Sequence, residues 1–152
     1  MPDSHIEFRI ISENDVPVLL RQMRLLYEAD GDPFDESATE RTLKAFLRSP
    51  QAGLGWVILV DGYPAGYMIL TFGFSLEFYG RDATLDEIYL ETPFRGRGIG
   101  RKALAYLEGQ ARALGVRALH LEVMRDNEPA QRLYVGMGFE NRERYFMMSK
   151  RL

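Results

Sequence analysis

Arg95-Gly96-Arg97-Gly98-Ile99-Gly100 lies between an extended apolar run, Leu85–Leu90, and a long helical pattern that begins near Ile99. A strand, a glycine-rich turn and a helix N-terminus in this order form an anion site, because the first N–H groups of a helix lack intrahelical partners. Glycines also remove the side chains that would keep a diphosphate away from the backbone. Arg101 adds a third cation after Arg95 and Arg97, so the stretch predicts a site for a nucleotide-like cofactor.

Length and composition indicate a single domain over residues 1–152. The chain is 46% hydrophobic and 27% charged, as is usual for a soluble globular protein. Its net charge of −3 argues against a nucleic-acid partner, since the arginine cluster is too small to be a basic binding surface. No apolar stretch approaches the roughly 18 residues of a membrane span, and the N-terminus shows no signal peptide. We therefore expect neither a nucleic-acid nor a membrane partner.

The chain has no cysteine and only two histidines, His5 and His120. The absence of cysteine excludes disulfides, thiolate metal ligands and a cysteine nucleophile, and it fits a reducing cytoplasm. Two histidines are a poor basis for a zinc site or for a serine–histidine triad. We expect a cytoplasmic protein without a metal.

Hydrophobic periodicity predicts strand, two helices, three strands, helix, strand, helix, and one or two final strands. The Asp61-Gly62 pair between two apolar runs is a strong hairpin signal, so the three middle strands form an antiparallel meander. The strand–helix–strand unit over residues 83–124 implies one parallel pair. The sequence therefore predicts a mixed, mostly antiparallel sheet with helices packed on it. The strands are expected at residues 6–11, 56–60, 63–74, 83–91, 118–124 and 139–150.

Three interpretations of the glycine stretch compete. The phosphate loop of many ATP- and GTP-binding proteins requires Gly-x-x-x-x-Gly-Lys-[Ser/Thr], which is absent from the chain. A dinucleotide-binding fingerprint requires Gly-x-Gly-x-x-Gly in a parallel sheet, whereas here the spacing is Gly96-x-Gly98-x-Gly100 after a meander. A surface turn without a ligand remains open on this stretch alone.

Two motifs together resemble those of the GNAT family of N-acetyltransferases. Arg95-x-x-Gly98-x-Gly100 resembles the family's diphosphate loop, and Asn127-Glu128-Pro129-Ala130-Gln131-Arg132-Leu133-Tyr134-x-x-x-Gly138-Phe139 is similar to its N-x-x-A-x-x-L-Y-x-x-x-G-F segment. They begin 32 residues apart with one helix and one strand between them, as in the family. The resemblance implies an α/β (α+β) GNAT fold, with a central sheet of six or seven strands, about four helices, and a splay between strands four and five. It also implies acetyl-CoA as co-substrate.

The resemblance further implies direct transfer of an acetyl group to a primary amine. In the family, the tyrosine at the Tyr134 position lies beside the thioester sulfur, so Tyr134 is the candidate acid for the departing thiolate; a tyrosine that anchors a short helix is the structural alternative. Asn127 is assigned to the cofactor by the family, although an N-cap explains it equally well. The cofactor contacts implied by the resemblance are Ile88, Tyr89, Leu90, Arg95, Gly96, Arg97, Gly98, Ile99, Gly100, Arg101, Asn127 and Tyr134.

A base must remove a proton from the amine, because an alkylammonium ion with a pKa of about 10.4 is not a nucleophile. Asp86 and Glu87 are adjacent in a central strand, so strict alternation points them to opposite faces. Both match acidic positions of polyamine-type family members, and Glu122 matches an acidic position of enzymes that acetylate protein N-termini. We rank Glu87 first, Asp86 second and Glu122 third. A water chain could also carry the proton, and each carboxylate could simply order a loop.

Acidic residues near the implied acceptor side favour a small cationic amine as the acceptor. They are Asp32, Asp35, Glu36, Glu77, Asp86 and Glu87. Protein N-termini and lysines remain open as acceptors, and so does a catalytically inactive domain that binds CoA as a sensor. Dimers are frequent in the family, so a homodimer is left open.

Overall fold

The computed structural model describes residues 3–152. The chain divides into two compact units, one ending at Glu122 and the other comprising Val123–Leu152. The expectation of a single domain over the whole chain stays a prediction.

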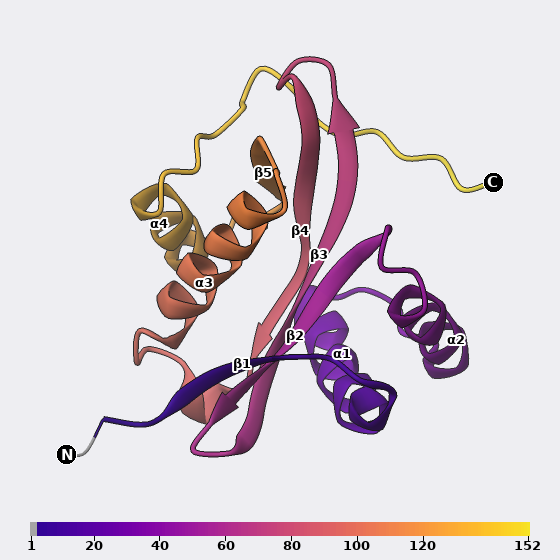
Figure 1. Cartoon of the computed structure of the whole chain (residues 1–152), viewed down its shortest axis with the longest axis vertical. Coiled ribbons are helices and arrows are strands. Elements are labelled where there is room, and N and C mark those ends of the chain that lie inside the picture. The colour runs from indigo at the N-terminus through magenta and orange to yellow at the C-terminus, as the bar shows by residue number, and fades with distance from the viewer. Residues whose placement is uncertain (1–2) are drawn as a thin grey trace. The chain divides into compact units, whose positions relative to one another are not determined.

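A five-stranded sheet forms the centre of the first unit (Figure 1). Its strands are β1 (Ile6–Ile10), β2 (Gly53–Val60), β3 (Tyr63–Ser75), β4 (Gly80–Leu90) and β5 (Ala118–Leu121). They lie in the order β1-β2-β3-β4-β5; the first four are antiparallel neighbours, and β5 runs parallel to β4. The mixed, mostly antiparallel sheet predicted from the sequence is confirmed, but its strand count of six or seven is too high.

Helices cover both faces of this sheet (Figure 1). One face carries α1 (Val16–Asp30) and α2 (Glu36–Leu47), and the other carries α3 (Ile99–Ala113). On the α1 face, Leu19, Val57 and Tyr67 are fully buried in one hydrophobic cluster. On the α3 face, the Tyr106 ring packs edge-on against Trp56 at 6.1 Å between centroids. Burial of apolar surface on both faces is the main stabilising contribution.

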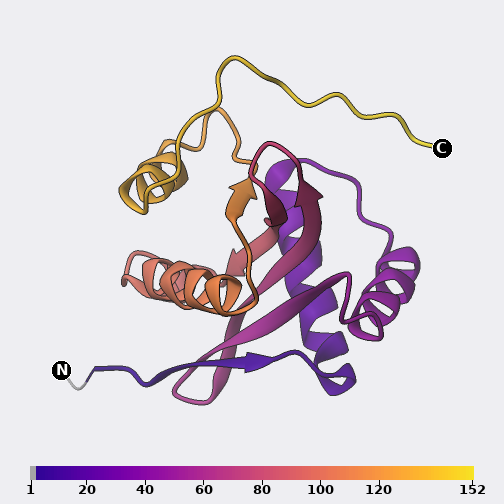
Figure 2. The same cartoon turned by 45° about the horizontal axis from the view of Figure 1, so that its top comes forward.

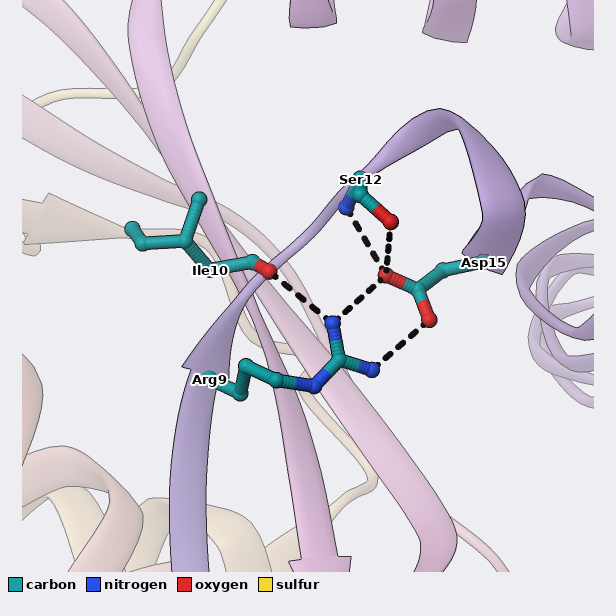
Figure 3. Close-up of polar contacts among 4 residues, drawn as sticks. All are labelled: Arg9, Ile10, Ser12 and Asp15. Carbon is teal, nitrogen blue, oxygen red and sulfur yellow. Dashed lines mark hydrogen bonds and ion pairs between the residues drawn. The ribbon is translucent and has the colours of Figure 1, made fainter.

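The junction between β1 and α1 is held by a carboxylate (Figure 3). Asp15 accepts two hydrogen bonds from the Arg9 guanidinium, at 3.1 and 2.8 Å, and one from the Ser12 backbone N–H at 2.8 Å. Asp15 closes a short 3-10 turn, η1 (Glu13–Asp15), immediately before α1. The sequence Ser12-Glu13-Asn14-Asp15 predicts a helix start with an acidic first turn, and the structure confirms it.

A β-bulge interrupts β4 in the middle of the sheet. Ile69 lies opposite Glu87, whereas the next residue, Leu70, lies opposite Leu85, so Asp86 is an extra residue on β4. Pairing with β5 ends at the same point, because Leu85 pairs with Leu121 and is the last residue of β4 in that ladder. Among the described residues, no strand continues along this edge of β4 beyond Leu85. The splay predicted between strands four and five is therefore present.

The second unit contains one helix, α4 (Glu128–Gly136), and an extended segment, residues 139–152. The segment is drawn as a trace without helix or arrow in Figure 2. The expectation of one or two strands over residues 139–150 is wrong for the single chain. The short helix predicted at Asn127 is confirmed.

Two smaller boundaries also differ from the sequence prediction. The capping-box spacing of Ser37-Ala38-Thr39-Glu40 predicts a helix that opens at Ser37. Helix α2 instead begins at Glu36 and is capped by Asp35, whose carboxylate accepts the Ala38 N–H at 2.9 Å. Strand β5 ends at Leu121 instead of Met124.

Candidate active site

The loop between β4 and α3 has the geometry of an anion cradle. After a 3-10 turn, η2 (Thr92–Phe94), Gly96 and Gly98 adopt φ values of +69° and +77°, which glycine reaches without strain. A Cβ built on Gly98 would meet no atom within 4 Å, so the loop is open on that side. The first backbone bond of α3 runs from Lys102 N–H to Gly98 O at 3.2 Å. The amides of residues 99–101 precede that bond, as at any helix start, and can bind a diphosphate.

Two arginines of the loop form hydrogen bonds with other residues of the chain. Arg95 Nε donates to Leu90 O at 2.7 Å, and its guanidinium lies over the Tyr89 ring at 5.5 Å. Arg97 donates to Ser4 Oγ at 2.7 Å. These contacts keep two cations beside the start of α3. The residues present therefore fit a bound diphosphate such as that of acetyl-CoA.

The outer edge of β4 leads from this loop toward the bulge. Ile88, Tyr89 and Leu90 lie on it, past the end of the β5 ladder. The Tyr89 side chain is buried, and its ring stacks on Tyr67 at 6.2 Å. Among the described residues no strand pairs with this edge beyond Leu85, although Leu90 O already accepts the Arg95 Nε bond; the pantetheine contacts on this edge stay a prediction.

Glu87 lies at the bulge between two tyrosines. Its Oε1 accepts the Tyr67 hydroxyl at 2.8 Å, and its Oε2 accepts the Tyr27 hydroxyl at 2.9 Å. Tyr67 comes from β3 and is fully buried, whereas Tyr27 comes from α1 and is half-buried. The sequence predicts Tyr67 as a core residue and Tyr27 as part of the apolar stripe of a helix, so it reveals neither as a partner of Glu87.

Burial raises the pKa of Glu87 above its ordinary value, because the ionised form loses solvation. The two tyrosine hydroxyls act in the opposite direction, since they donate to the carboxylate, while Asp86 and Asp30 raise the pKa further. Partial desolvation also raises the pKa of Asp86, although its side chain is exposed overall. Glu87 is the more enclosed of the two carboxylates, and its role as the base stays a prediction.

The bulge changes the expected orientation of the acidic pair. Strict alternation requires Asp86 and Glu87 to face opposite sides of the sheet, but alternation is broken where Asp86 is inserted. Both carboxylates raise the pKa of Tyr27, which lies on the α1 face. Two acidic side chains therefore act on the same region beside α1.

Glu122 and His120 lie at the end of β5. Glu122 is exposed and follows the last residue of the strand. His120 Nε2 lies 3.0 Å from Asp82 Oδ2, and its ring is 5.2 Å from that of Phe78. The histidine thus has a structural partner, in keeping with a satisfied histidine of the sheet.

The second unit carries the other two predicted residues. Asn127 caps α4, and its side-chain oxygen accepts the Ala130 N–H at 3.3 Å. Tyr134 lies on the same helix with its ring 5.9 Å from Phe139, and burial raises its pKa. The capping role of Asn127 is thereby established, and its role toward a cofactor stays a prediction.

Glu91 is the first residue of the cradle loop and accepts hydrogen bonds from three side chains. Sequence reasoning did not predict these contacts. The Glu91 carboxylate accepts hydrogen bonds from Arg21 and Gln22 of α1, each at 3.0 Å, and from the Tyr63 hydroxyl at 3.0 Å. Gln22 is fully buried and also donates to Pro64 O at 2.9 Å. A buried glutamine in a helix otherwise packed with apolar residues is the signal that could have revealed this contact.

Within residues 3–152, no three histidine, aspartate or glutamate side chains gather closely enough to hold a metal ion. In the same range, no helix has the length and apolar character needed to cross a bilayer.

Comparison with known proteins identifies the family. The model of the Acetyltransferase (GNAT) family matches residues 20–139, which include the cradle loop and α4. The chain is 38% identical over 72 residues to the uncharacterized N-acetyltransferase YycN of Bacillus subtilis, a match covering 47% of this chain and 45% of that protein. It is 27% identical over 144 residues to thialysine N-epsilon-acetyltransferase of Bos taurus, covering 90% of this chain and 85% of the relative.

A solved structure shares the fold over the full length. Aminoglycoside N-acetyltransferase AAC(6')-Iy in complex with CoA superposes with a TM-score of 0.83 and 18% identity, covering 100% of this chain and 99% of that one. At this identity the likeness shows the fold alone. The family match, the two motifs and the cradle loop agree, and the chain therefore belongs to the acetyltransferase (GNAT) family and is an N-acetyltransferase with acetyl-CoA as its co-substrate.

Proposed function

We propose that the enzyme transfers the acetyl group directly to the primary amine of a small cationic acceptor. The observation that carries this proposal is Glu87, an enclosed carboxylate held by Tyr27 and Tyr67 at the bulge where β4 parts from β5. Asp86 adds a second negative charge beside it. A pair of carboxylates attracts an ammonium ion and can then take its proton.

In this proposal Glu87 is the general base. The raised pKa of Glu87 lies closer to the pKa of an amine than the pKa of an ordinary glutamate does. Proton transfer from the ammonium ion to Glu87 is therefore less unfavourable. The tyrosine hydroxyls keep both carboxylate oxygens oriented, and each oxygen retains a second lone pair for the incoming amine. Acetyl-CoA supplies the acetyl group, and the amides and arginines of the cradle loop hold its diphosphate.

Tyr134 is assigned as the proton donor to the departing thiolate. The assignment rests on its place in the Asn127–Phe139 motif. Its raised pKa keeps the phenol protonated at neutral pH, as a donor requires. Arg95, Gly96, Arg97, Gly98, Ile99, Gly100 and Arg101 are proposed as diphosphate contacts, with Ile88, Tyr89 and Leu90 as pantetheine contacts.

The names of two similar proteins support an amine as the acceptor. One is an N-epsilon-acetyltransferase of thialysine, and the other an N-acetyltransferase of aminoglycosides. Both names describe small molecules with cationic amino groups. Two other acidic residues near the acceptor side have structural partners: Asp35 caps α2, and Glu36 lies 3.4 Å from Arg24. Asp86 and Glu87 are adjacent at the bulge, and we assign the acceptor charge to them.

A thiol-release assay with acetyl-CoA tests the proposal. The acceptor panel comprises diamines, lysine analogues, an aminoglycoside, a neutral amine, and peptides with a free N-terminus or an internal lysine. Turnover that is fastest with the small cationic amines, and strongly reduced in Glu87→Gln, supports the proposal. A preference for the peptides would instead identify a protein acetyltransferase. CoA binding without turnover on any amine would identify a sensor domain.

A further inference from the structure

The loop that leads from β4 to α3 begins with a carboxylate. Glu91 directly follows the last residue of β4, and its side chain is only 15% exposed. Enclosure of an ionised carboxylate costs solvation free energy, and a negative charge beside a site for a diphosphate repels the ligand. The charge of Glu91 therefore works against cofactor binding, and its enclosure must be offset by contacts.

Three side chains from two elements hold this carboxylate. Its Oε1 accepts hydrogen bonds from Arg21 and Gln22 of α1, and its Oε2 accepts the Tyr63 hydroxyl of β3, each at 3.0 Å. Arg21 and Glu91 form an ion pair, which offsets the negative charge. Gln22 is fully buried, so the carboxylate is fixed to a residue of the core. Removing the carboxylate would take an acceptor away from this buried amide, which costs free energy.

The Tyr63 ring extends the connection into the loop. It stacks on Phe94 at 5.6 Å between centroids, and the Arg97 guanidinium lies over the same Phe94 ring at 5.8 Å. The Glu91 backbone contributes as well, since its N–H donates to Ala65 O at 2.8 Å and its carbonyl oxygen accepts the Phe94 N–H at 2.9 Å. The side chain and the backbone of Glu91 therefore both fix the turn that precedes the glycines of the loop.

We propose that Glu91 is a positioning residue for acetyl-CoA, which holds the cradle loop in the geometry that receives the diphosphate without touching the cofactor itself. Amide donors bind a phosphate oxygen well only within about 2.7–3.2 Å, so a small displacement of the loop weakens several contacts together. A loop that is already ordered also loses less conformational entropy when the ligand binds. These gains outweigh the repulsion between the carboxylate and the diphosphate.

This inference concerns the cofactor and does not depend on the proposed acceptor or base. Its test can therefore be a calorimetric titration with CoA, which needs no amine. For Glu91→Ala we expect the Kd for CoA to rise by about five- to thirty-fold, because up to three hydrogen bonds that fix the loop are lost. The KM for acetyl-CoA should rise in parallel. The kcat at saturating substrates should stay nearly unchanged, because Glu91 contacts no reacting atom.

Two further variants separate positioning from charge and from general stability. Glu91→Gln keeps one acceptor oxygen and should bind CoA with an affinity between those of Glu91→Ala and the unmodified enzyme. Glu13→Ala removes a comparable ion pair, with Arg48 at the C-terminal end of α2, and should leave the Kd for CoA unchanged. If Glu91→Ala and Glu91→Gln both bind CoA more tightly than the unmodified enzyme, charge repulsion dominates and the proposal is wrong.

The unliganded enzyme provides an independent measurement. In Glu91→Ala the amides of Phe94 and Arg95, which form hydrogen bonds within the turn, should exchange their hydrogens faster than in the unmodified enzyme. The amides of α2 should exchange at an unchanged rate. Equal exchange at Phe94 and Arg95 in the two enzymes would contradict a positioning role.

Tyr63→Phe removes one of the three hydrogen bonds and keeps the ring that stacks on Phe94. We expect a smaller rise in the Kd for CoA, and we expect the double variant with Glu91→Ala to bind CoA as weakly as Glu91→Ala alone, since the hydroxyl acts through Glu91. If Glu91→Ala does not fold, Tyr63→Phe and Glu91→Gln carry the test. An unchanged Kd for CoA in the variants that retain the circular dichroism spectrum of the unmodified enzyme overturns the proposal.

Discussion

The Tyr27 hydroxyl of α1 donates a 2.9 Å hydrogen bond to Glu87 of β4, across 60 residues of sequence. A helix on the face of the sheet thereby positions the carboxylate proposed to accept the proton of the amine.

Replacing the base should greatly reduce turnover without weakening cofactor binding. For Glu87→Gln we expect kcat to fall by about 10²- to 10⁴-fold, the usual contribution of a general base, with an unchanged KM for acetyl-CoA. Steady-state thiol release measures both parameters. Asp86→Asn and Glu122→Gln should have smaller effects, and the surface variant Glu108→Gln should have none. A larger loss in Glu122→Gln than in Glu87→Gln would reverse the assignment.

The acid limb of the pH–rate profile should report Glu87. Burial raises the pKa of Glu87 above the ordinary range of a glutamate. As the pH falls, activity should therefore be lost at a higher pH than an ordinary glutamate would give. The Tyr27 hydroxyl lowers this pKa, so in Tyr27→Phe the limb should move to higher pH. Tyr63→Phe, which loses a bond to Glu91 instead, is the matched control and should leave the limb in place. An unshifted limb in Tyr27→Phe would argue against Glu87 as the titrating group.

Tyr134→Phe removes the proposed proton donor while keeping the ring that contacts Phe139. We expect kcat to fall by about 10²-fold or more, because the thiolate then departs without a proton from the enzyme. The thermal shift produced by CoA should persist, since the diphosphate is held elsewhere. Full activity in Tyr134→Phe would show that Tyr134 is not the proton donor and serves only to anchor α4.

The cradle loop can be tested at a single glycine. Gly98 has φ +77°, so alanine there costs about 1–2 kcal/mol in backbone strain although its Cβ meets no atom within 4 Å. If the loop relieves this strain by moving, the KM for acetyl-CoA should rise by about five- to thirty-fold. Gly109→Ala, in the middle of α3, also meets no atom within 4 Å and should leave this KM unchanged. Equal KM values for the two variants would exclude a precise role for the loop.

The meander, the cradle loop and the crossover helix were predictable from sequence because their signals are local. Asp61-Gly62 marks the hairpin, and the spacing of the glycines marks the start of α3. The bulge at Asp86 was not predictable, since two adjacent acidic residues fit either register of a strand. Tyr27 and Tyr67 were missed as partners of Glu87 because aromatic residues at core spacing do not show where their hydroxyls point.

The C-terminal strands illustrate a different limit. The run from Tyr145 to Met148 has the residue types of a strand, and the sequence correctly marked it as unlike a helix. A strand exists only when its backbone is paired, and a composition typical of a strand does not show what the backbone pairs with. Local composition therefore predicted a tendency to form a strand, but no strand is formed over residues 139–152.

Helix α1 contacts β4 and the residue that follows it: Tyr27 binds Glu87, and Gln22 binds Glu91. Glu87 belongs to the proposed acceptor side, and Glu91 begins the loop that cradles the diphosphate. If binding of either substrate displaces α1, these two hydrogen bonds carry the displacement to the other site. Such linkage is reciprocal: if acetyl-CoA strengthens binding of the amine by some factor, the amine strengthens binding of acetyl-CoA by the same factor. A buried glutamine far from the reacting atoms would then contribute to how strongly each substrate favours the binding of the other.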